Sequence, residues 1–576
     1  MAFDSLIMQA VTEELRAQIS GMSVQRIYQP GRSEIVIHFY NNGKQVGLLI
    51  SVDSRNARVH LTDRRYQSQD QPSPFCMLLR KYLIGARVAS FTNPPLERVL
   101  EINFDPPDGM PAVKLLAEIM SQRSNLILVN TEGLILGAAR TASWVKNPVR
   151  AVMPGEMYRP VPPQNKLDPV MLDQNIFASM IELQINSGKS PEQSLFNTVQ
   201  GVSPQIAREL LFKSNWDENE LLASSQRLLA ETKQMFLAAA DGRYDPVMVP
   251  DKNTFAAFSL THLGNHPQIS FASVNKMLDQ FFDRQVKQER ENLLREQLRG
   301  TVTRRLARLD KKRLQQEKEL LASTEAPLLR QYGDLLLTYG DNVPRGADHV
   351  VLPDLYDSDL MVTVPLDPSK SASANAQKYF NRYRRAKKGQ TLIQNQLNIT
   401  GTEIDYCQEL IYTIDGSTET SLEEIRQELI DGGYLRDKKK PVRKKNPAPQ
   451  PLLFRTSAGH TVMVGRNNRQ NEYITFKAAA RRDTWFHVRA LPGSHVLLKE
   501  APFPPSQEDI EEAAYLAACY SKGRDSVAVA VDYTEVRHVR RRPGGKPGSV
   551  FYENFETITV NPQNEQLKNK FFLGEK

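Results

Sequence analysis

The sequence predicts a multidomain α+β protein. The chain has 576 residues, which is too long for one hydrophobic core and suits roughly three to five folding units. Short β-rich runs lie near both ends of the chain, whereas its middle shows long stretches of helical periodicity with little glycine. These two observations place strands and helices in separate blocks, as expected of α+β domains.

Composition limits the classes of protein that remain. The chain carries 74 Lys and Arg against 66 Asp and Glu, a formal net charge of +8 that is unevenly distributed. Cys76, Cys407 and Cys519 form no CxxC pair and no disulfide framework, which indicates a reducing compartment and no zinc ribbon. No span is apolar enough to cross a bilayer, and the first residues lack a basic signal region. We therefore expect a cytoplasmic protein with no membrane partner.

Residues 1–170 are expected to form the first domain, an α+β unit of antiparallel strands that ends near Pro160–Pro163. Helical spacing predicts a helix over residues 3–20 and a second helix at Pro74–Leu83. Runs rich in β-branched and aromatic residues predict strands. The predicted strands are Ser23–Tyr28, Glu34–Tyr40, Gly47–Val52, Arg58–Leu61, Val88–Thr92, Val99–Phe104, Lys114–Glu118 and Asn125–Val129.

Residues 171–268 are predicted to be a helical domain. Within it Gly201 makes a turn, and Ser203 and Pro204 open the next helix. This pattern resembles a helix-hairpin-helix, whose backbone amides hold a nucleic-acid phosphate. An ordinary packing corner between two helices is the alternative, and the sequence favours it.

Residues 269–436 are predicted to form a long antiparallel coiled coil. One helix is expected over Val274–Leu321, with leucine and valine recurring every three or four residues. A returning helix is expected over Ser373–Leu397 and onward through Ser421–Gly432. Between them, residues of about 340–370 include a strand-and-turn insertion, His349–Val364, that would cap the pair. The cations of the first helix exceed its acidic residues, which points only weakly to RNA.

The basic, proline-rich segment 437–451 is predicted to be an extended linker. After it, residues 452–576 are predicted to form a compact α/β domain with a helix at Ser506–Tyr520. Its strands are expected at Phe454, Thr461–Val464, His487–Val488, His495–Leu498, Val527–Val531 and Thr557–Val560.

A short segment of this last domain gathers potentially reactive side chains. Asp483, Trp485, His487 and His495 lie close together in sequence, with a turn at Gly493. A hydrolase triad with Ser494 is disfavoured, because adjacent strand residues face opposite sides. The two histidines and Asp483 leave a metal site open, but no further ligand completes a common zinc set. We therefore expect no catalytic residue, metal or cofactor here, and interpret the four residues as an RNA-facing surface or partly as core.

Two basic segments also suggest nucleic acid. Lys378, Arg382, Arg384 and Arg385 alternate with aromatic rings at the start of the returning helix, a pattern that suits phosphate neutralisation with stacking. A helix with buried rings and solvated cations explains it equally well.

The other segment contains Arg537, Arg540 and Arg541 and leads into a Gly/Pro-rich loop through Lys546. Such a run buries little surface and favours a polyanion partner, with RNA as the expected one.

Longer motifs resemble the NFACT family. The C-terminal segments Val464–Tyr473, Asp483–His487, Pro492–Val496, Val531–Thr534 and Lys546–Val550 resemble its NFACT-R domain. Pro74–Lys81, Glu118–Met120 and Ser124-Asn125 resemble its NFACT-N domain, and Leu366–Pro368 with Asn375–Phe380 resembles its middle domain. The likeness covers nearly the whole chain in the same order.

The resemblance implies a ribosome quality-control factor. Such proteins bind a stalled large (50S) ribosomal subunit, through its rRNA and proteins, and recruit alanyl-tRNA for untemplated alanine tailing of the nascent chain. An S4-like RNA-binding protein is an expected partner. Family residues implicated in tRNA contact fall on Glu97, Arg98, Glu118, Ile119 and Met120. Glu97 replaces the usual aspartate, and Ser121 replaces the glycine that usually follows the second motif.

Two other functions remain open. Some family members have fibronectin-binding names, so a surface adhesin is one alternative. A nucleic-acid processing enzyme is the other, since the family's N-terminal fold resembles DNA glycosylases. Those enzymes use a terminal proline amine, whereas this chain begins Met1-Ala2, so no glycosylase activity is expected.

Overall fold

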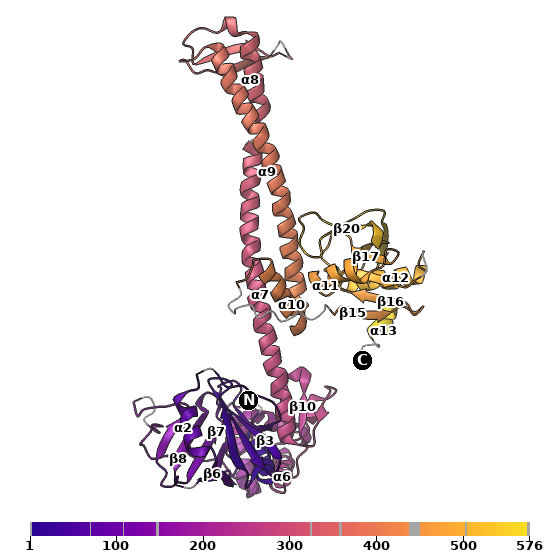
Figure 1. The fold of residues 1–576 in the computed structure, drawn as a ribbon. Coiled ribbons are helices and arrows are strands. Elements are labelled where there is room, and N and C mark those ends of the chain that lie inside the picture. Colours follow the sequence, from indigo (N-terminus) through magenta and orange to yellow (C-terminus); the bar gives the residue numbers. More distant parts are fainter. Residues whose placement is uncertain are drawn as a thin grey trace. The chain divides into compact units, whose positions relative to one another are not determined.

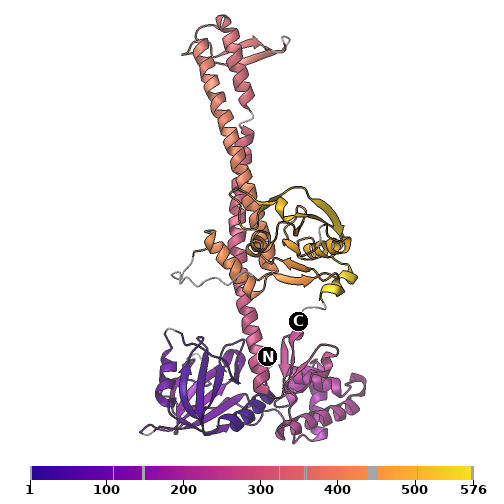
Figure 2. The same ribbon diagram turned by 45° about the vertical axis from the view of Figure 1, so that its right-hand side comes forward.

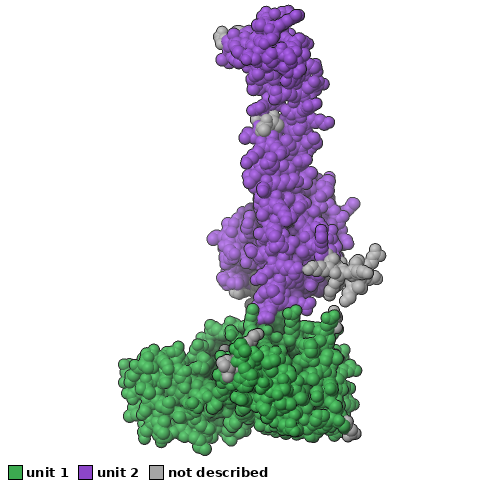
Figure 3. All heavy atoms as spheres, turned by 90° about the vertical axis from the view of Figure 1, so that its left-hand side faces the viewer, with its two compact units in different colours: residues 1–287 green, residues 288–576 purple. Residues whose placement is uncertain are grey.

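The computed structural model describes residues 3–69, 71–107, 109–145, 149–322, 325–355, 357, 360–436, 450–501 and 504–572. The chain forms two compact units, residues 1–287 and 288–576 (Figure 3). The predicted α+β class is confirmed, because both antiparallel sheets and long helices are present. The predicted linker lies outside the described residues except for Gln450 and Pro451. None of the described helices has the length and apolar character needed to span a membrane.

Unit 1 contains a nine-stranded antiparallel sheet in the order β4-β3-β2-β1-β5-β6-β7-β8-β9. The strands are β1 (Ser23–Tyr28), β2 (Glu34–Asn41), β3 (Lys44–Ser51), β4 (Arg58–Thr62), β5 (Arg87–Thr92), β6 (Val99–Asp105), β7 (Val113–Glu118), β8 (Asn125–Asn130) and β9 (Ile135–Ala138). All eight predicted strands are present; only β9 was missed. Its four residues are too few to show a clear alternation.

Helices α1 (Ser5–Ile19) and α2 (Pro74–Leu83) pack against this sheet. Each begins at a side-chain cap: Asp4 accepts from the Ile7 amide and Ser73 accepts from the Cys76 amide. Close packing of α2 on β9 depends on Gly137, because a Cβ there would lie 2.5 Å from Leu78. The predicted helices at 3–20 and Pro74–Leu83 are therefore confirmed.

Four helices follow beside the sheet (Figures 1 and 2), with a small sheet in the order β11-β10-β12. They are α3 (Gln174–Asn186), α4 (Pro191–Thr198), α5 (Pro204–Lys213) and α6 (Leu221–Ala240). The small sheet comprises β10 (Val247–Val249), β11 (Thr254–Ala256) and β12 (Ile269–Ser270). These helices share one hydrophobic core with the nine-stranded sheet, so unit 1 is a single packed body.

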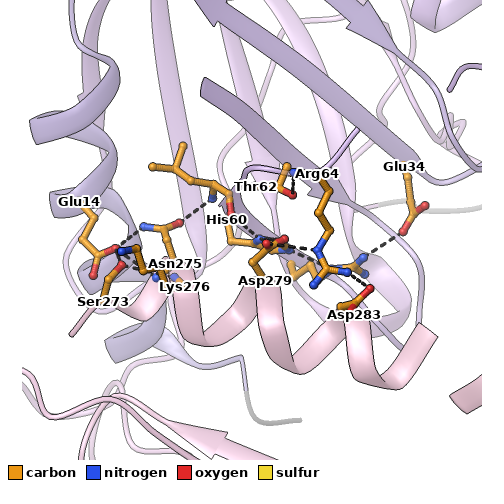
Figure 4. Close-up of polar contacts among 12 residues, drawn as sticks. Glu14, Glu34, His60, Thr62, Arg64, Ser273, Asn275, Lys276, Asp279 and Asp283 are labelled. Carbon is orange, nitrogen blue, oxygen red and sulfur yellow. Dashed lines mark hydrogen bonds and ion pairs between the residues drawn. The ribbon is translucent and has the colours of Figure 1, made fainter. Parts of the chain in front are cut away.

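The start of α7 (Val274–Ala322) is tied to this body by polar contacts (Figure 4). The Glu14 carboxylate accepts hydrogen bonds from Ser273 Oγ at 2.6 Å and from the Val274 amide at 2.7 Å. Asn275 Oδ1 accepts from the Leu61 amide at 2.7 Å. A carboxylate at a helix N-terminus satisfies its free amides and its dipole, so Glu14 fixes where α7 begins.

One turn further along α7, charged residues meet His60 (Figure 4). Arg64 pairs with Asp279 at 3.3 Å and also with Asp283. Arg58 Nε donates to His60 Nε2 at 3.4 Å. Burial, reinforced by the nearby Arg58 charge, lowers the pKa of His60 to about 3. His60 is therefore a neutral acceptor in the folded unit.

Unit 2 is built on the continuing α7 and on α9 (Ala372–Asp415), which run antiparallel. Leu298 and Val302 of α7 share a core with Cys407 and Leu410 of α9, and Thr400 Oγ1 donates to Gln316 Oε1 at 2.9 Å further along. Helix α10 (Glu419–Asp431) packs into the same core. The predicted antiparallel helix pair is confirmed, whereas its classification as a coiled coil and the proposed domain limits stay predictions.

At the other end of the pair, α8 (Ala326–Thr338) packs on α9 beside the hairpin of β13 (His349–Pro353) and β14 (Met361–Pro365). Leu335, Leu352, Val364 and Tyr379 form its core. The insertion predicted at His349–Val364 is therefore present as a hairpin.

The C-terminal part of unit 2 has a six-stranded antiparallel sheet in the order β15-β16-β18-β17-β19-β22, covered by α12. Its elements are β15 (Leu452–Arg455), β16 (Thr461–Val464), α11 (Asn468–Tyr473), a π-helical turn (Ile474–Ala478), β17 (Thr484–Val488), β18 (Val496–Lys499), α12 (Gln507–Cys519), β19 (Val529–Glu535), β22 (Glu556–Val560) and α13 (Glu565–Phe572). A separate hairpin pairs β20 (Val539–Arg541) with β21 (Val550–Tyr552).

The sequence did not predict this hairpin. The basic run was expected only to lead into a Gly/Pro-rich loop and to bury little surface. Instead Val539, Arg540 and Arg541 pair with Tyr552, Phe551 and Val550. The partner strand lies beyond the Gly/Pro-rich turn, so local sequence gives little sign of it.

Candidate nucleic-acid interface

The structure brings the two motifs of the first domain together. Strand β6 starts directly after Arg98, and β7 ends at Glu118, with Val99 opposite Glu118. Beyond the end of the ladder, the Ile119 amide donates to the Arg98 carbonyl at 2.9 Å. Glu97-Arg98 and Glu118–Met120 therefore occupy one edge of the sheet. The first motif precedes β6, and the second lies at the end of β7.

Arg98 lines a cavity of about 220 Å³, which we call the Arg98 cavity. Lys166, Asp4 and Glu97 line it too, with the turn at Gly201. The Arg98 guanidinium is half-buried and makes no hydrogen bond or ion pair among the residues that the structure describes. Burial raises the pKa of Glu97 and of Asp4, while the Arg98 charge opposes both shifts. The cavity thus presents an uncommitted cation at its wall.

Glu118 and Ile119 are interior residues. Glu118 is 1% exposed and accepts hydrogen bonds from both terminal nitrogens of Arg150, one of them at 2.9 Å. The Tyr158 hydroxyl donates to it at 2.9 Å. Because Ile119 is fully buried as well, direct side-chain contact with tRNA is not available to either residue. Their buried side chains instead fix the backbone at Met120, next to Arg98.

Positive φ angles mark the backbone at both motifs. Ser121 has φ +55° and Leu96, just before Glu97, has φ +56°. This left-handed region suits glycine and is unusual for other residues. It gives a physical reason why a glycine normally follows the second motif, and Ser121 keeps that conformation.

The turn between α4 and α5 forms part of the Arg98 cavity. Gly201 has φ +81°, and a Cβ there would lie 3.0 Å from the Phe236 ring. Ser203 Oγ donates to Asp4 Oδ2 at 3.0 Å, and Ser5 Oγ donates to the Gly201 carbonyl at 2.9 Å. The turn is therefore packed on α1, as a packing corner requires. Its assignment as a phosphate-binding helix-hairpin-helix stays a prediction.

The basic segment of α9 divides into buried rings and exposed cations. Tyr379 lies in the core of the β13–β14 end and donates to the Pro365 carbonyl at 2.6 Å. Lys378 pairs with Asp367 at 3.3 Å, whereas Arg384 donates to Asn381 at 2.6 Å. Lys378, Arg382, Arg384 and Arg385 lie on the outer face of the helix. The packing interpretation holds for Tyr379. Arg382, Arg384 and Arg385 have no ion pair within the described residues and remain available to a phosphate backbone.

Trp485 and His495 are core residues. Trp485 is 0% and His495 2% exposed, and their rings lie 5.1 Å apart edge to face. Thr475 Oγ1 and His495 Nδ1 share a hydrogen bond of 2.8 Å. Burial lowers the pKa of His487 to about 4 and that of His495 well below its ordinary value. The expectation that these rings face RNA is corrected for Trp485 and His495, since neither exposes a face for stacking.

Asp483 has a structural contact. Asp483 accepts from the Ala480 amide at 2.7 Å and so shapes the turn before β17. Among the described residues, no three His, Cys, Asp or Glu side chains group as metal ligands.

Arg537, Arg540 and Arg541 reach solvent, but each already has a carboxylate partner. Arg540 pairs with Glu553 at 3.2 Å and Arg541 with Glu472 at 2.7 Å, while Arg537 pairs with Glu535. An exposed pair contributes about 0–1 kcal/mol, so a phosphate can replace Glu553 as the partner of Arg540 at little cost. Glu535, in contrast, is buried.

Sequence patterns missed Asp4, Lys166 and Arg150. Each is a lone charged residue far from the motifs it joins, and only the fold brings it there. No local signal in the sequence identifies them.

Comparisons with known proteins identify the family. A sequence model of the NFACT N-terminal and middle domains matches residues 4–448, and a model of the NFACT protein RNA binding domain matches residues 450–554. The Rqc2 homolog RqcH of Bacillus subtilis is 32% identical, over 98% of this chain and 99% of its own. RqcH of Streptococcus suis is 31% identical, over 99% and 100%. A solved structure, the C-terminal part of the fibronectin/fibrinogen-binding protein from Streptococcus suis, is 31% identical with a TM-score of 0.40 and covers 49% of this chain and 99% of that one.

Proposed function

Since the chain belongs to the NFACT family, we propose that it acts in ribosome quality control. In this proposal it binds stalled large (50S) ribosomal subunits that carry peptidyl-tRNA, through rRNA and ribosomal proteins. There it recruits alanyl-tRNA, so that the nascent chain receives an untemplated alanine tail that marks it for degradation. The protein would work in the cytoplasm, bound to ribosomes, with an S4-like RNA-binding protein as a further partner.

The observation that carries this proposal is the meeting of both motifs at one edge of the sheet, where Arg98 also lines the Arg98 cavity. The exposed part of Arg98 can donate two parallel hydrogen bonds to a phosphate. Lys166 adds a second cation at the same wall. Buried Glu118 and Ile119 keep the edge in shape. The resulting surface is suited to holding an RNA backbone rather than to breaking a bond.

The chain's contribution is therefore recruitment and positioning. Peptidyl transfer would be performed by the ribosomal RNA, and no residue of this chain is assigned to it. Glu97, Arg98 and Met120 are proposed to touch tRNA. The exposed cations of α9 and of the β20–β21 hairpin are proposed to contact rRNA.

Arg98→Ala tests this assignment. We expect the variant to lose tRNA from affinity-purified protein, because an arginine of the cavity that has no ion pair within the described residues is gone. Large-subunit rRNA should still be recovered. The matched control is Arg243→Ala, which removes an exposed arginine paired with Asp241 at 2.8 Å and outside the cavity lining. It should keep both RNAs. Loss of both RNAs with Arg98→Ala, or of neither, would contradict the role of Arg98.

The adhesin alternative makes a different prediction. A surface adhesin would be labelled strongly by a membrane-impermeant biotin reagent on intact cells, whereas a cytoplasmic ribosome-bound factor would be labelled only after lysis. A processing enzyme would cleave or modify purified RNA without ribosomes.

A further inference from the structure

A second cavity, of about 410 Å³, lies in unit 2 where four segments far apart in sequence meet. Its walls are one face of α7, α9 at Glu403, the turn after α10 and the connection between β20 and β21. We call it the α7 cavity. Its cationic lining residues are Arg304, Arg305, Arg308, Arg436 and Lys546. Glu403 is the single carboxylate among the described lining residues, so the cavity attracts anions.

Glu403 neutralises only part of this charge. Its carboxylate pairs with Arg305 at 2.9 Å and lies 3.8 Å from Lys546 Nζ. Arg304 donates to Thr301 Oγ1 at 3.4 Å, which leaves its charge uncompensated. Within the described part of the chain neither Arg304 nor Arg308 nor Arg436 has an ion pair. Like charges held close together repel one another, and a bound anion would relieve this repulsion.

Tyr434 contributes its aromatic ring to the wall. Lys546 Nζ lies 5.2 Å from its ring centroid, and its hydroxyl is buried without a partner among the described residues. Burial raises the pKa of Tyr434 to about 12, so the hydroxyl keeps its proton at neutral pH. Buried polar groups rarely lack partners. Gly432 allows the ring to lie over the turn, since a Cβ there would be 3.1 Å from it.

The cations also continue beyond the cavity. Lys311 and Lys312, further along α7, are exposed and have no ion pair within the described residues. From Arg304 to Lys312 the helix rises by about 12 Å. Neighbouring phosphates of one nucleic-acid strand lie about 3.4 Å apart along the helix axis, so this row of cations is long enough to face several phosphates. A single small anion would leave this row of charge unused.

We propose that the α7 cavity binds the phosphate backbone of a single-stranded RNA segment. The inference deepens the proposed function, on which it rests, by naming an RNA site in unit 2. Phosphate oxygens would accept hydrogen bonds from Arg304 and Arg308. Lys546 would approach from the C-terminal domain, so bound RNA would also strengthen the contact of that domain with α7.

The test is a salt series on the full-length protein. The probe is a fluorescein-labelled oligouridylate of about twelve nucleotides, within the site size of single-strand binders. We expect Arg304→Ala/Arg308→Ala to weaken binding about tenfold or more. The slope of log Kd against log salt should fall by about 1.4, because each phosphate that the protein no longer neutralises removes about 0.7 from the slope. Lys546→Ala should reduce the slope by about 0.7.

The matched control is Arg313→Ala, on the same helix. Arg313 is neutralised by Asp310 and Glu317, each 3.7 Å away, so its removal should leave the slope unchanged. The α7 cavity is refuted as an RNA site if the double variant keeps the affinity and slope of the unmodified protein, or if the unmodified protein does not bind the probe.

Inorganic triphosphate is the second probe, measured by calorimetry. Binding of triphosphate that the double variant abolishes, together with an unchanged RNA slope, would identify a small anion as the occupant and overturn the RNA assignment. A failure of the α7 cavity to bind RNA can be distinguished from a failure of the proposed function, because the recovery of tRNA with Arg98→Ala is measured separately.

Discussion

Removing Arg150 should destabilise unit 1 strongly, because it leaves Glu118 buried without its cation. Glu118 is 1% exposed, and its carboxylate accepts hydrogen bonds from Arg150 and from the Tyr158 hydroxyl. Breaking a buried pair by deleting one partner costs about 3–5 kcal/mol. Replacement of Arg150 by methionine keeps much of the side chain's apolar volume, so we expect a loss in that range.

The double variant Glu118→Gln/Arg150→Met separates charge from packing. With both charges removed, no orphan carboxylate is left, and we expect more than half of the lost stability to return. The chain has two compact units, and such proteins can unfold in more than one transition. Stability is therefore measured for each unit separately, by hydrogen exchange in a urea series followed by mass spectrometry. Peptides of β7 and β8 report the effect, and peptides of β17 and β19 are the internal control.

A loss of less than about 1 kcal/mol for Arg150→Met would refute the reasoning, since that is the range of exposed ion pairs. Equal losses in the single and double variants would refute it too, because the cost would then lie in packing and not in an unpaired charge. In either case Glu118 would no longer be explained as the residue that positions the edge beside Arg98.

Three further changes have defined outcomes. Ser121→Gly should stabilise unit 1, or at least not weaken it, because φ +55° costs serine about 1 kcal/mol; a lower urea midpoint would contradict this. Acidification should lower the stability of unit 1. The pKa of His60 is about 3 in the folded unit against an ordinary 6.5, so the unfolded state binds more protons between those pH values. His60→Asn should reduce the pH dependence of the urea midpoint measured from pH 6.5 downward. Glu428 should affect stability in the opposite direction. Burial raises its pKa from 4.5 to about 7, so its contribution to the stability of unit 2 is present below pH 4.5 and is lost as pH rises through 7. A pH dependence that persists in Glu428→Gln would show that another group is responsible.

Local patterns were sufficient for elements whose partners are sequence neighbours. The strands from Ser23 to Asn130 each alternate or carry β-branched runs, and their order in the sheet largely follows the chain. The helices α2 and α7 carry both periodicity and a start signal. Such elements can be predicted because the information is contained in about ten consecutive residues.

Burial at the candidate sites could not be predicted in the same way. Trp485 sits in a motif that suits a stacking platform, yet β18 and the β20–β21 hairpin bring His495 and Tyr552 to within 5.1 and 5.0 Å of its ring. The interior position depends on strands that pair over long distances. The RNA-facing interpretation is therefore wrong for Trp485, and the alternative, that part of the cluster is core, is confirmed for this residue.

The charged sites follow the same rule. Sequence places Arg98 and Glu118 in motifs, but Arg150 and Lys166 join them only through the fold. The α7 cavity has no motif at all, because its cations come from α7, from the turn after α10 and from the β20–β21 connection.

The most direct test of the central claim is to purify the tagged protein from growing cells and sequence the RNA bound to it. The account predicts enrichment of one tRNA species together with large-subunit rRNA, with alanine tRNA as the expected species. Recovery of DNA, or of no RNA, would contradict a role in ribosome quality control.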